Sequence, residues 1–224
     1  MRVKTEAKRL AILDVATQVF LEMGYERTSM GEITARLGGS KGTLYSYFAS
    51  KEELFMRVVI HKVGSQVDQA LQDLTPFADH DPHAVLCRFG EQLMGALLTP
   101  DALALKRAII THMQNSDMER QLWQLGPEKL IKEIESYLAA ATAAGRLRVA
   151  KPGVAARQLL ALYEAESNWS LRADKDARFS AKRIKLEAAR AVDVFLAAYG
   201  AKDADGLARD VAQVAKPATG RRGK

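Results

Sequence analysis

Residues 38–48 read GGSKGTLYSYF, and this stretch decides the fold. Its two glycines end the preceding helix, because glycine readily adopts the left-handed conformation that closes a helix. Ser40 is a preferred N-cap residue, so a second helix begins directly after it. The stretch therefore predicts one helix over residues 30–37 and another over 41–47. So short a connection makes the two helices cross steeply, which is the layout of a helix-turn-helix.

The neighbouring sequence completes a small helical unit. A capping box, Ser29 with Glu32, marks the start of the first short helix. A helix over residues 5–24 precedes it, with apolar residues at helical spacing and a glycine as its stop. Ser50 caps a long helix over residues 51–74, whose first turn carries two glutamates that suit the helix dipole.

The second short helix has two different sides. On a wheel of about 100° per residue, Leu44 and Phe48 lie about 40° apart and face inward. Tyr45 and Tyr47 lie about 100° to either side of the outward direction. This arrangement suits a DNA major groove, because small polar residues enter the groove and the tyrosine hydroxyls reach the phosphates beside it. Each tyrosine taken singly could equally be an ordinary half-buried aromatic. The small residues on the outward side are Gly42, Thr43 and Ser46.

Residues 9–58 resemble the DNA-binding domain of the TetR/AcrR family of regulators. The resemblance lies in Thr28-Ser29, Ile33, Gly38, Ser40 to Tyr45, Tyr47-Phe48 and Ser50 to Phe55. It implies that Thr28, Tyr45, Tyr47 and Lys51 hold phosphates, and that Lys41, Gly42 and Thr43 approach bases. With the capping and outward-facing serines added, the predicted DNA-contacting set is Thr28, Ser29, Ser40, Lys41, Gly42, Thr43, Tyr45, Ser46, Tyr47 and Lys51.

The chain departs from the family pattern at three positions. Gly39 stands in place of a usual valine, and Thr34 and Leu37 stand in place of usual alanines. Gly39 loses one core contact, and we expect Leu37 to refill the space.

The rest of the chain also predicts helices, most of which begin with a proline at the first position. We expect an all-α fold that divides into a helix-turn-helix domain over residues 1–50, a linker helix, an effector-binding and dimerisation bundle over 75–200, and a disordered basic tail over 201–224. The expected helices of the bundle cover residues 82–98, 100–115, 117–124, 127–144, 152–173 and 180–199.

The second half more weakly resembles an AefR-like C-terminal domain. Its last two helices are rich in alanine, which lets helices pack closely in a dimeric four-helix bundle. We expect Phe195, Leu196 and Tyr199 to anchor the dimer interface, although the same residues could belong to an intramolecular core. A ligand pocket would combine aromatic surface with a few polar groups, although such residues are more often core. The predicted pocket residues are His112, Met113, Trp123, Tyr163, Glu166 and Trp169.

Composition limits the class of protein. The net charge of +6 fits a nucleic-acid partner. One cysteine allows no internal disulfide, and no window approaches the roughly 20 apolar residues of a membrane span, so we expect a soluble cytoplasmic protein. His80 and His83 flank a loop rather than form a metal pair, and we expect neither a metal nor another cofactor. Residues 39–43 superficially resemble a phosphate-binding loop, but their lysine precedes the glycine and no strand leads into them.

The sequence thus predicts a transcriptional regulator rather than an enzyme. By resemblance, we expect a ligand-responsive repressor that binds a palindromic operator as a homodimer and is released by a small hydrophobic effector. The alternatives are an activator of the same fold and a helical-bundle adaptor or enzyme without DNA binding.

Overall fold

The fold is all-α, as predicted. The computed structural model describes residues 5–72, 74, 80–112, 117–174 and 177–201, and within these ranges it has no β-strand, only one isolated bridge between Leu147 and Gly200. The helices are α1 (Glu6–Arg27), α2 (Met30–Leu37), α3 (Lys41–Tyr47), α4 (Lys51–Gln72), α5 (Pro82–Leu97), α6 (Pro100–His112), α7 (Asp117–Leu125), α8 (Pro127–Ala143), α9 (Pro152–Ala173) and α10 (Ala181–Tyr199).

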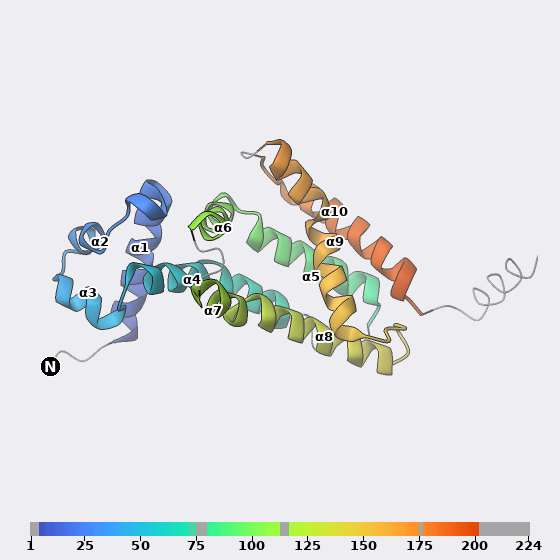
Figure 1. The fold of residues 1–224 in the computed structure, drawn as a ribbon. Helices are drawn as coiled ribbons and strands as arrows, with labels where there is room; N and C mark the ends of the chain where they lie inside the picture. Colours follow the sequence, from blue (N-terminus) through green and yellow to red (C-terminus); the bar gives the residue numbers. More distant parts are fainter. Residues whose placement is uncertain (1–4, 73, 75–79, 113–116, 175–176, 202–224) are drawn as a thin grey trace, which may run out of the picture.

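The helices form two groups joined by α4 (Figure 1). In the first group, α1 packs against α4 and α2 packs against α1 and α3. Its core contains Ile12, Phe20, Ile33, Leu44 and Phe55, one or more residues from each of the four helices. Because these side chains hold α3 from behind, its opposite side faces away from the protein.

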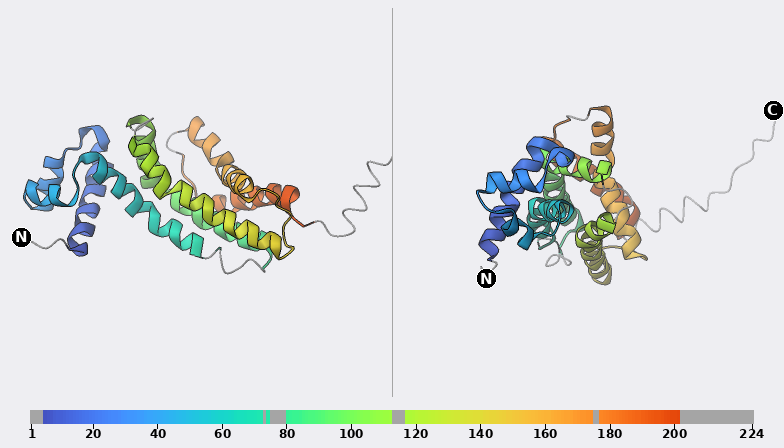
Figure 2. Two further views of the ribbon diagram at one scale, coloured as in Figure 1. Left: turned by 60° about the horizontal axis from the view of Figure 1, so that its bottom comes forward. Right: turned by 60° about the vertical axis from the view of Figure 1, so that its left-hand side comes forward.

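The second group is a helical bundle at the other end of α4 (Figure 2). Helix α10 packs on α5 and α9, and α8 packs on α9. Large side chains such as Phe89, Tyr137, Tyr163 and Phe195 fill its core. A proline begins α5, α6, α8 and α9, as predicted, because proline fits the first helical position.

The first helix ends later than the sequence predicts. Gly24 has a left-handed φ of 77° and interrupts α1 as expected, but one further turn follows it to Arg27. That turn carries Tyr25 into the core of the first group. The predicted basic tail beyond residue 201 lies outside the described residues.

Helix α6 contributes one residue to the core of the first group of helices. Leu105 of α6 is buried among the apolar side chains of α1 to α4, and Ala108 and Ile109 pack against the same cluster. Helix α6 therefore contacts both groups of helices. None of the helices that the structure describes is long and apolar enough to cross a membrane.

Candidate nucleic-acid interface

Short-range hydrogen bonds fix the positions of α2 and α3. The Ser29 hydroxyl accepts a hydrogen bond from the Glu32 N–H at 3.1 Å, and the Ser40 hydroxyl accepts one from the Thr43 N–H at 3.2 Å. Gly38 closes α2 with φ 67° and ψ 30°, a left-handed cap that glycine adopts without strain. The caps and the turn predicted from the sequence are thus confirmed.

Helix α3 presents the outward side that its sequence predicts. Leu44 and Phe48 are buried, while Gly42 and Ser46 are exposed. Tyr45 is 50% exposed, a large fraction for an aromatic side chain. The structure therefore brings a polar, tyrosine-bearing surface to the free side of a firmly packed helix.

The side chains of Lys41 and Tyr47 reach from α3 toward two other helices, α2 and the start of α1. The Lys41 side chain lies beside the first turn of α2, because a Cβ added to Gly31 would be 3.8 Å from the Lys41 Nζ and 3.6 Å from the Ser29 Oγ. The half-buried Tyr47 accepts a hydrogen bond from the Thr5 N–H at 2.9 Å. Tyr47 therefore also fixes the residue that caps α1.

Thr28 does not offer its hydroxyl outward. Its side chain is buried, and its Oγ1 donates a hydrogen bond to the Gly24 carbonyl at 2.8 Å. A β-branched hydroxyl at the end of a helix readily bonds a carbonyl four residues earlier. The side chain therefore closes α1, and its hydroxyl is bonded within the protein.

Lys51 is also engaged within the protein. Its Nζ donates a hydrogen bond to the Tyr25 carbonyl at 3.0 Å and lies 4.2 Å from the centroid of the Tyr25 ring. The lysine thus ties the end of α1 to the start of α4. Ser50 caps the beginning of α4, because its hydroxyl accepts from the Glu53 N–H at 3.1 Å, and the Glu53 carboxylate accepts from the Ala49 N–H at 2.7 Å.

Tyr25 connects three helices, and the sequence prediction does not include it. Its hydroxyl donates to Glu52 at 3.3 Å, and its ring stacks on His112 with the centroids 5.4 Å apart. Burial, followed by the nearby Glu52 charge, raises the pKa of Tyr25 to about 12, so the phenol stays protonated at neutral pH. The ring therefore lies between α1, α4 and α6, a position that its spacing in the sequence does not reveal.

The predicted pocket residues do not come together. His112 Nδ1 lies 2.8 Å from the Glu26 carboxylate and so joins α6 to α1. Tyr163 is buried, with its hydroxyl donating to the Leu86 carbonyl at 2.7 Å. Trp123 and Trp169 are both exposed. Met113 lies outside the described residues.

Glu166, the last of these residues, forms a bidentate pair with Arg190, at 2.7 and 2.6 Å, which connects α9 to α10. Hydrogen bonding to the Arg190 guanidinium lowers the pKa of the Glu166 carboxyl. This glutamate therefore links two helices instead of lining a cavity with the tryptophans.

The predicted dimer anchors lie partly or wholly in the core of their own chain. Phe195 is only 1% exposed and lies in the core of its own chain, in contact with the half-buried Tyr199 ring. Leu196 packs, half-buried, against the same core. The large apolar side chains that the described parts of α9 and α10 expose are Val154, Trp169, Leu186 and Val194.

A cysteine, a histidine and an aspartate meet between α5 and α10. His83 Nε2 lies 3.1 Å from Asp193 Oδ1, and Cys87 Sγ lies 3.8 Å from His83 Nδ1. Burial, together with the surrounding carboxylates, raises the pKa of the Cys87 thiol. The thiol is therefore protonated at neutral pH and lacks the activation of a catalytic nucleophile. Within the described ranges, no three His, Cys, Asp or Glu side chains are grouped as metal ligands.

Comparison with known proteins places both halves of the chain. Residues 12–58 match the family described as "Bacterial regulatory proteins, tetR family", and residues 84–201 match "AefR-like transcriptional repressor, C-terminal domain". The second match alone covers more than half of the chain. The protein belongs to the TetR family. TetR-family proteins are DNA-binding transcriptional regulators and not enzymes, so the helix-turn-helix has the function that its sequence predicts.

Individual TetR-family relatives share the fold along most of the chain. The HTH-type regulator YhgD of Bacillus subtilis is 26% identical over 165 residues, which are 70% of this chain and 81% of that protein. A TetR-family regulator from Mesorhizobium loti has a TM-score of 0.78 at 26% identity, over 89% of this chain and all of the other. The Flavonoid-responsive Regulator FrrA has a TM-score of 0.69 at 28% identity, with the same coverage.

Proposed function

We propose that this TetR-family regulator is a ligand-responsive repressor that binds a palindromic operator in the cytoplasm as a homodimer. The observation that carries the proposal is the polar outward side of α3, with Tyr45 half exposed above the buried Leu44 and Phe48. A helix supported from behind and polar in front has the form that enters a major groove.

The contacts to DNA divide into two kinds. Gly42, Thr43 and Ser46 approach base edges, because they are small and face outward from α3. Tyr45 and Tyr47 contact phosphates at the two walls of the groove. Lys41 contacts either a base edge or a phosphate held by the backbone N–H groups at the start of α2, beside which its side chain lies. Thr28 and Lys51 act as positioning residues, since their polar groups are bonded within the protein.

The exposed apolar residues of α9 and α10 form the dimer face in this proposal. Leu186 and Val194 are eight residues apart on α10, and Trp169 on α9 is 75% exposed. On α9 the exposed alanines Ala161 and Ala165 allow a second helix to approach closely. A dimer that reads a palindromic site needs its two copies of α3 about one DNA turn, roughly 34–36 Å, apart.

Helix α6 couples the bundle to the DNA-binding helices. It buries Leu105 in the first core, pairs Asp101 with Lys62 of α4 at 2.9 Å, and ends at His112 against Glu26 of α1. A ligand that favours another position of α6 would therefore also favour another position of α3. Such a ligand shifts the population of dimers away from the spacing that fits the operator.

The test is fluorescence anisotropy of a labelled DNA fragment from upstream of the protein's own gene. We expect saturable binding, whose logarithmic affinity falls linearly with the logarithm of the salt concentration, because phosphate contacts release counterions. A scrambled fragment of equal length is the control. Equal affinity for both fragments across the salt range would contradict operator recognition.

A further inference from the structure

A cavity of about 410 Å³ lies between the α5–α6 turn and the connection from α9 to α10. Its volume falls in the range of sites for small organic molecules. Leu98, Leu103, Phe179 and Ile184 make its walls apolar. It shares no residue with the pocket predicted from the sequence.

Two arginines give this apolar cavity a positive charge. Arg107 of α6 and Arg178 of the α9–α10 connection both line it, and both are exposed. In the part of the chain that the structure describes, neither guanidinium forms an ion pair, whereas nine other arginine and lysine side chains do. Unpaired guanidinium groups beside an apolar cavity match a molecule with an apolar body and an anionic end.

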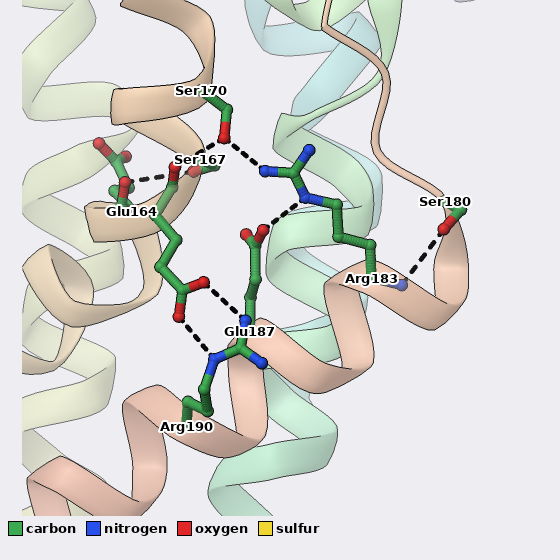
Figure 3. A network of polar contacts seen from close by, with 8 residues as sticks. Glu164, Ser167, Ser170, Ser180, Arg183, Glu187 and Arg190 are labelled. Carbon is green, nitrogen blue, oxygen red and sulfur yellow. Dashed lines mark hydrogen bonds and ion pairs between the residues drawn. The ribbon is translucent and has the colours of Figure 1, made fainter.

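The aromatic wall of the cavity, Phe179, packs against Arg183, and Figure 3 shows the polar contacts of that arginine with Glu187 and Ser170. Arg183 lies over the Phe179 ring, with its Cζ 4.6 Å from the centroid. The same guanidinium donates to the buried Glu187 at 2.6 Å and to the Ser170 hydroxyl of α9. Phe179 is therefore fixed before any ligand arrives, which lowers the entropy cost of binding.

We propose that this cavity binds an amphipathic organic anion, with the apolar body against Phe179 and Leu103 and the carboxylate, sulfonate or phosphate group between Arg107 and Arg178. An effect of the bound anion on operator affinity rests on the proposed function. It would pass through α6, which supplies Leu103 and Arg107 to the cavity and Leu105 to the core beneath the DNA-binding helices. Binding of the anion itself does not depend on DNA binding.

The experiment uses two fluorescent probes of similar shape, anilinonaphthalene sulfonate and the uncharged N-phenylnaphthylamine, titrated into the full-length protein. The double variant R107Q/R178Q should weaken sulfonate binding about tenfold or more, because two charge-assisted hydrogen bonds are lost. Its affinity for the neutral probe should change less than about twofold, since the apolar walls are intact. R120Q/R146Q removes the same charge from exposed positions elsewhere and should bind both probes as the wild type does.

A second variant tests the cavity without changing charge. Gly95 lines the cavity, and a Cβ added there meets no atom within 4 Å, so G95F is expected to fold and to fill the space. It should reduce binding of both probes about tenfold, whereas operator affinity without a probe should remain that of the wild type.

Unchanged sulfonate affinity in both R107Q/R178Q and G95F would overturn the site. If G95F lost both probes while R107Q/R178Q kept the wild-type affinity for the sulfonate, the cavity's preference for anions would be overturned. Operator binding, measured separately on the same samples, shows whether the DNA-binding function fails independently.

Discussion

Helices α3 and α9 each expose an aromatic side chain, but different parts of the sequence determine that exposure. On α3, the cap at Ser40, the glycine turn and the inward Leu44 determine the position of Tyr45, and all of them lie within eight residues of it. On α9, the exposed side carrying Trp169 is set by the opposite side of the helix, where Tyr163 packs on α5. The first surface is readable from local signals, whereas the second depends on contacts between distant residues.

The two surfaces also differ in chemistry. Around Tyr45 the exposed groups are hydroxyls, an ammonium and glycine, which suit a charged and hydrated partner such as DNA. Helices α9 and α10 instead expose Trp169, Leu186 and Val194, and large exposed apolar side chains of this kind suit a contact with another protein surface. We therefore expect changes on the α9–α10 face to alter the dimer dissociation constant, and changes on α3 to alter operator affinity.

The largest effect should come from the α9–α10 face. The double variant L186E/V194E places two carboxylates on each proposed dimer face, and we expect the dimer dissociation constant to rise more than about a hundredfold because buried unpaired charges are costly. Sedimentation velocity measures the change. K185E, on another side of α10, is the control and should stay dimeric. A dimer of L186E/V194E at wild-type concentrations would show that this face is not the interface.

Changes on α3 should leave the dimer intact and weaken operator binding. K41Q should lower affinity about tenfold and reduce the slope of log affinity against log salt by about one, as expected for the loss of a phosphate contact. Y45F should lower affinity about fivefold through one lost hydrogen bond. K132Q on α8 controls for the loss of charge. A K41Q variant with the wild-type salt slope would assign Lys41 a base contact or no contact.

The packing of α9 is tested by two glycines on α5. A Cβ on Gly90 would lie 2.4 Å from the Tyr163 ring, while a Cβ on Gly95 meets nothing within 4 Å. We expect G90A to lower the free energy of unfolding by about 2–3 kcal/mol through overpacking. G95A should raise it by about 0.5–1 kcal/mol through helix propensity. Urea denaturation measures both, and equal values would mean that Tyr163 does not fix α9.

The local signals around α3 are tested by a second glycine pair. Gly38 has a left-handed φ of 67°, so G38A should lower the free energy of unfolding by about 1 kcal/mol. A Cβ on Gly39 would meet the Leu37 side chain at 3.9 Å, an ordinary contact. G39A should therefore be neutral or stabilising by up to about 0.5 kcal/mol. Thermal denaturation distinguishes the two variants, and a larger loss in G39A would contradict the geometry of the turn.

The sequence predicts the helices well because their ends carry strong local signals. The expected bounds 41–47 and 152–173 are those of α3 and α9, since a serine cap begins one and a proline begins the other. The inward Leu44 and Phe48 follow from helical periodicity alone, because α3 is short and packs on one side only.

Side chains placed by long-range packing could not be predicted in the same way. The sequence places Phe195 at a dimer interface because it stands near the end of an alanine-rich helix, but its side chain is buried in the core of its own chain. His112 was expected in a pocket, but Tyr25 and Glu26, more than eighty residues earlier, bind it instead. Thr28 was expected to reach a phosphate, and a carbonyl of its own helix satisfies its hydroxyl.

Hydroxyl-radical footprinting of the operator tests the central claim most directly. If two copies of α3 enter successive major grooves, the DNA should show two protected patches related by a dyad, about 10–10.5 base pairs apart. The same footprint made with Y45F should retain the spacing and require more protein. A single protected patch, or a pattern without two-fold symmetry, would contradict a dimer that reads DNA through α3.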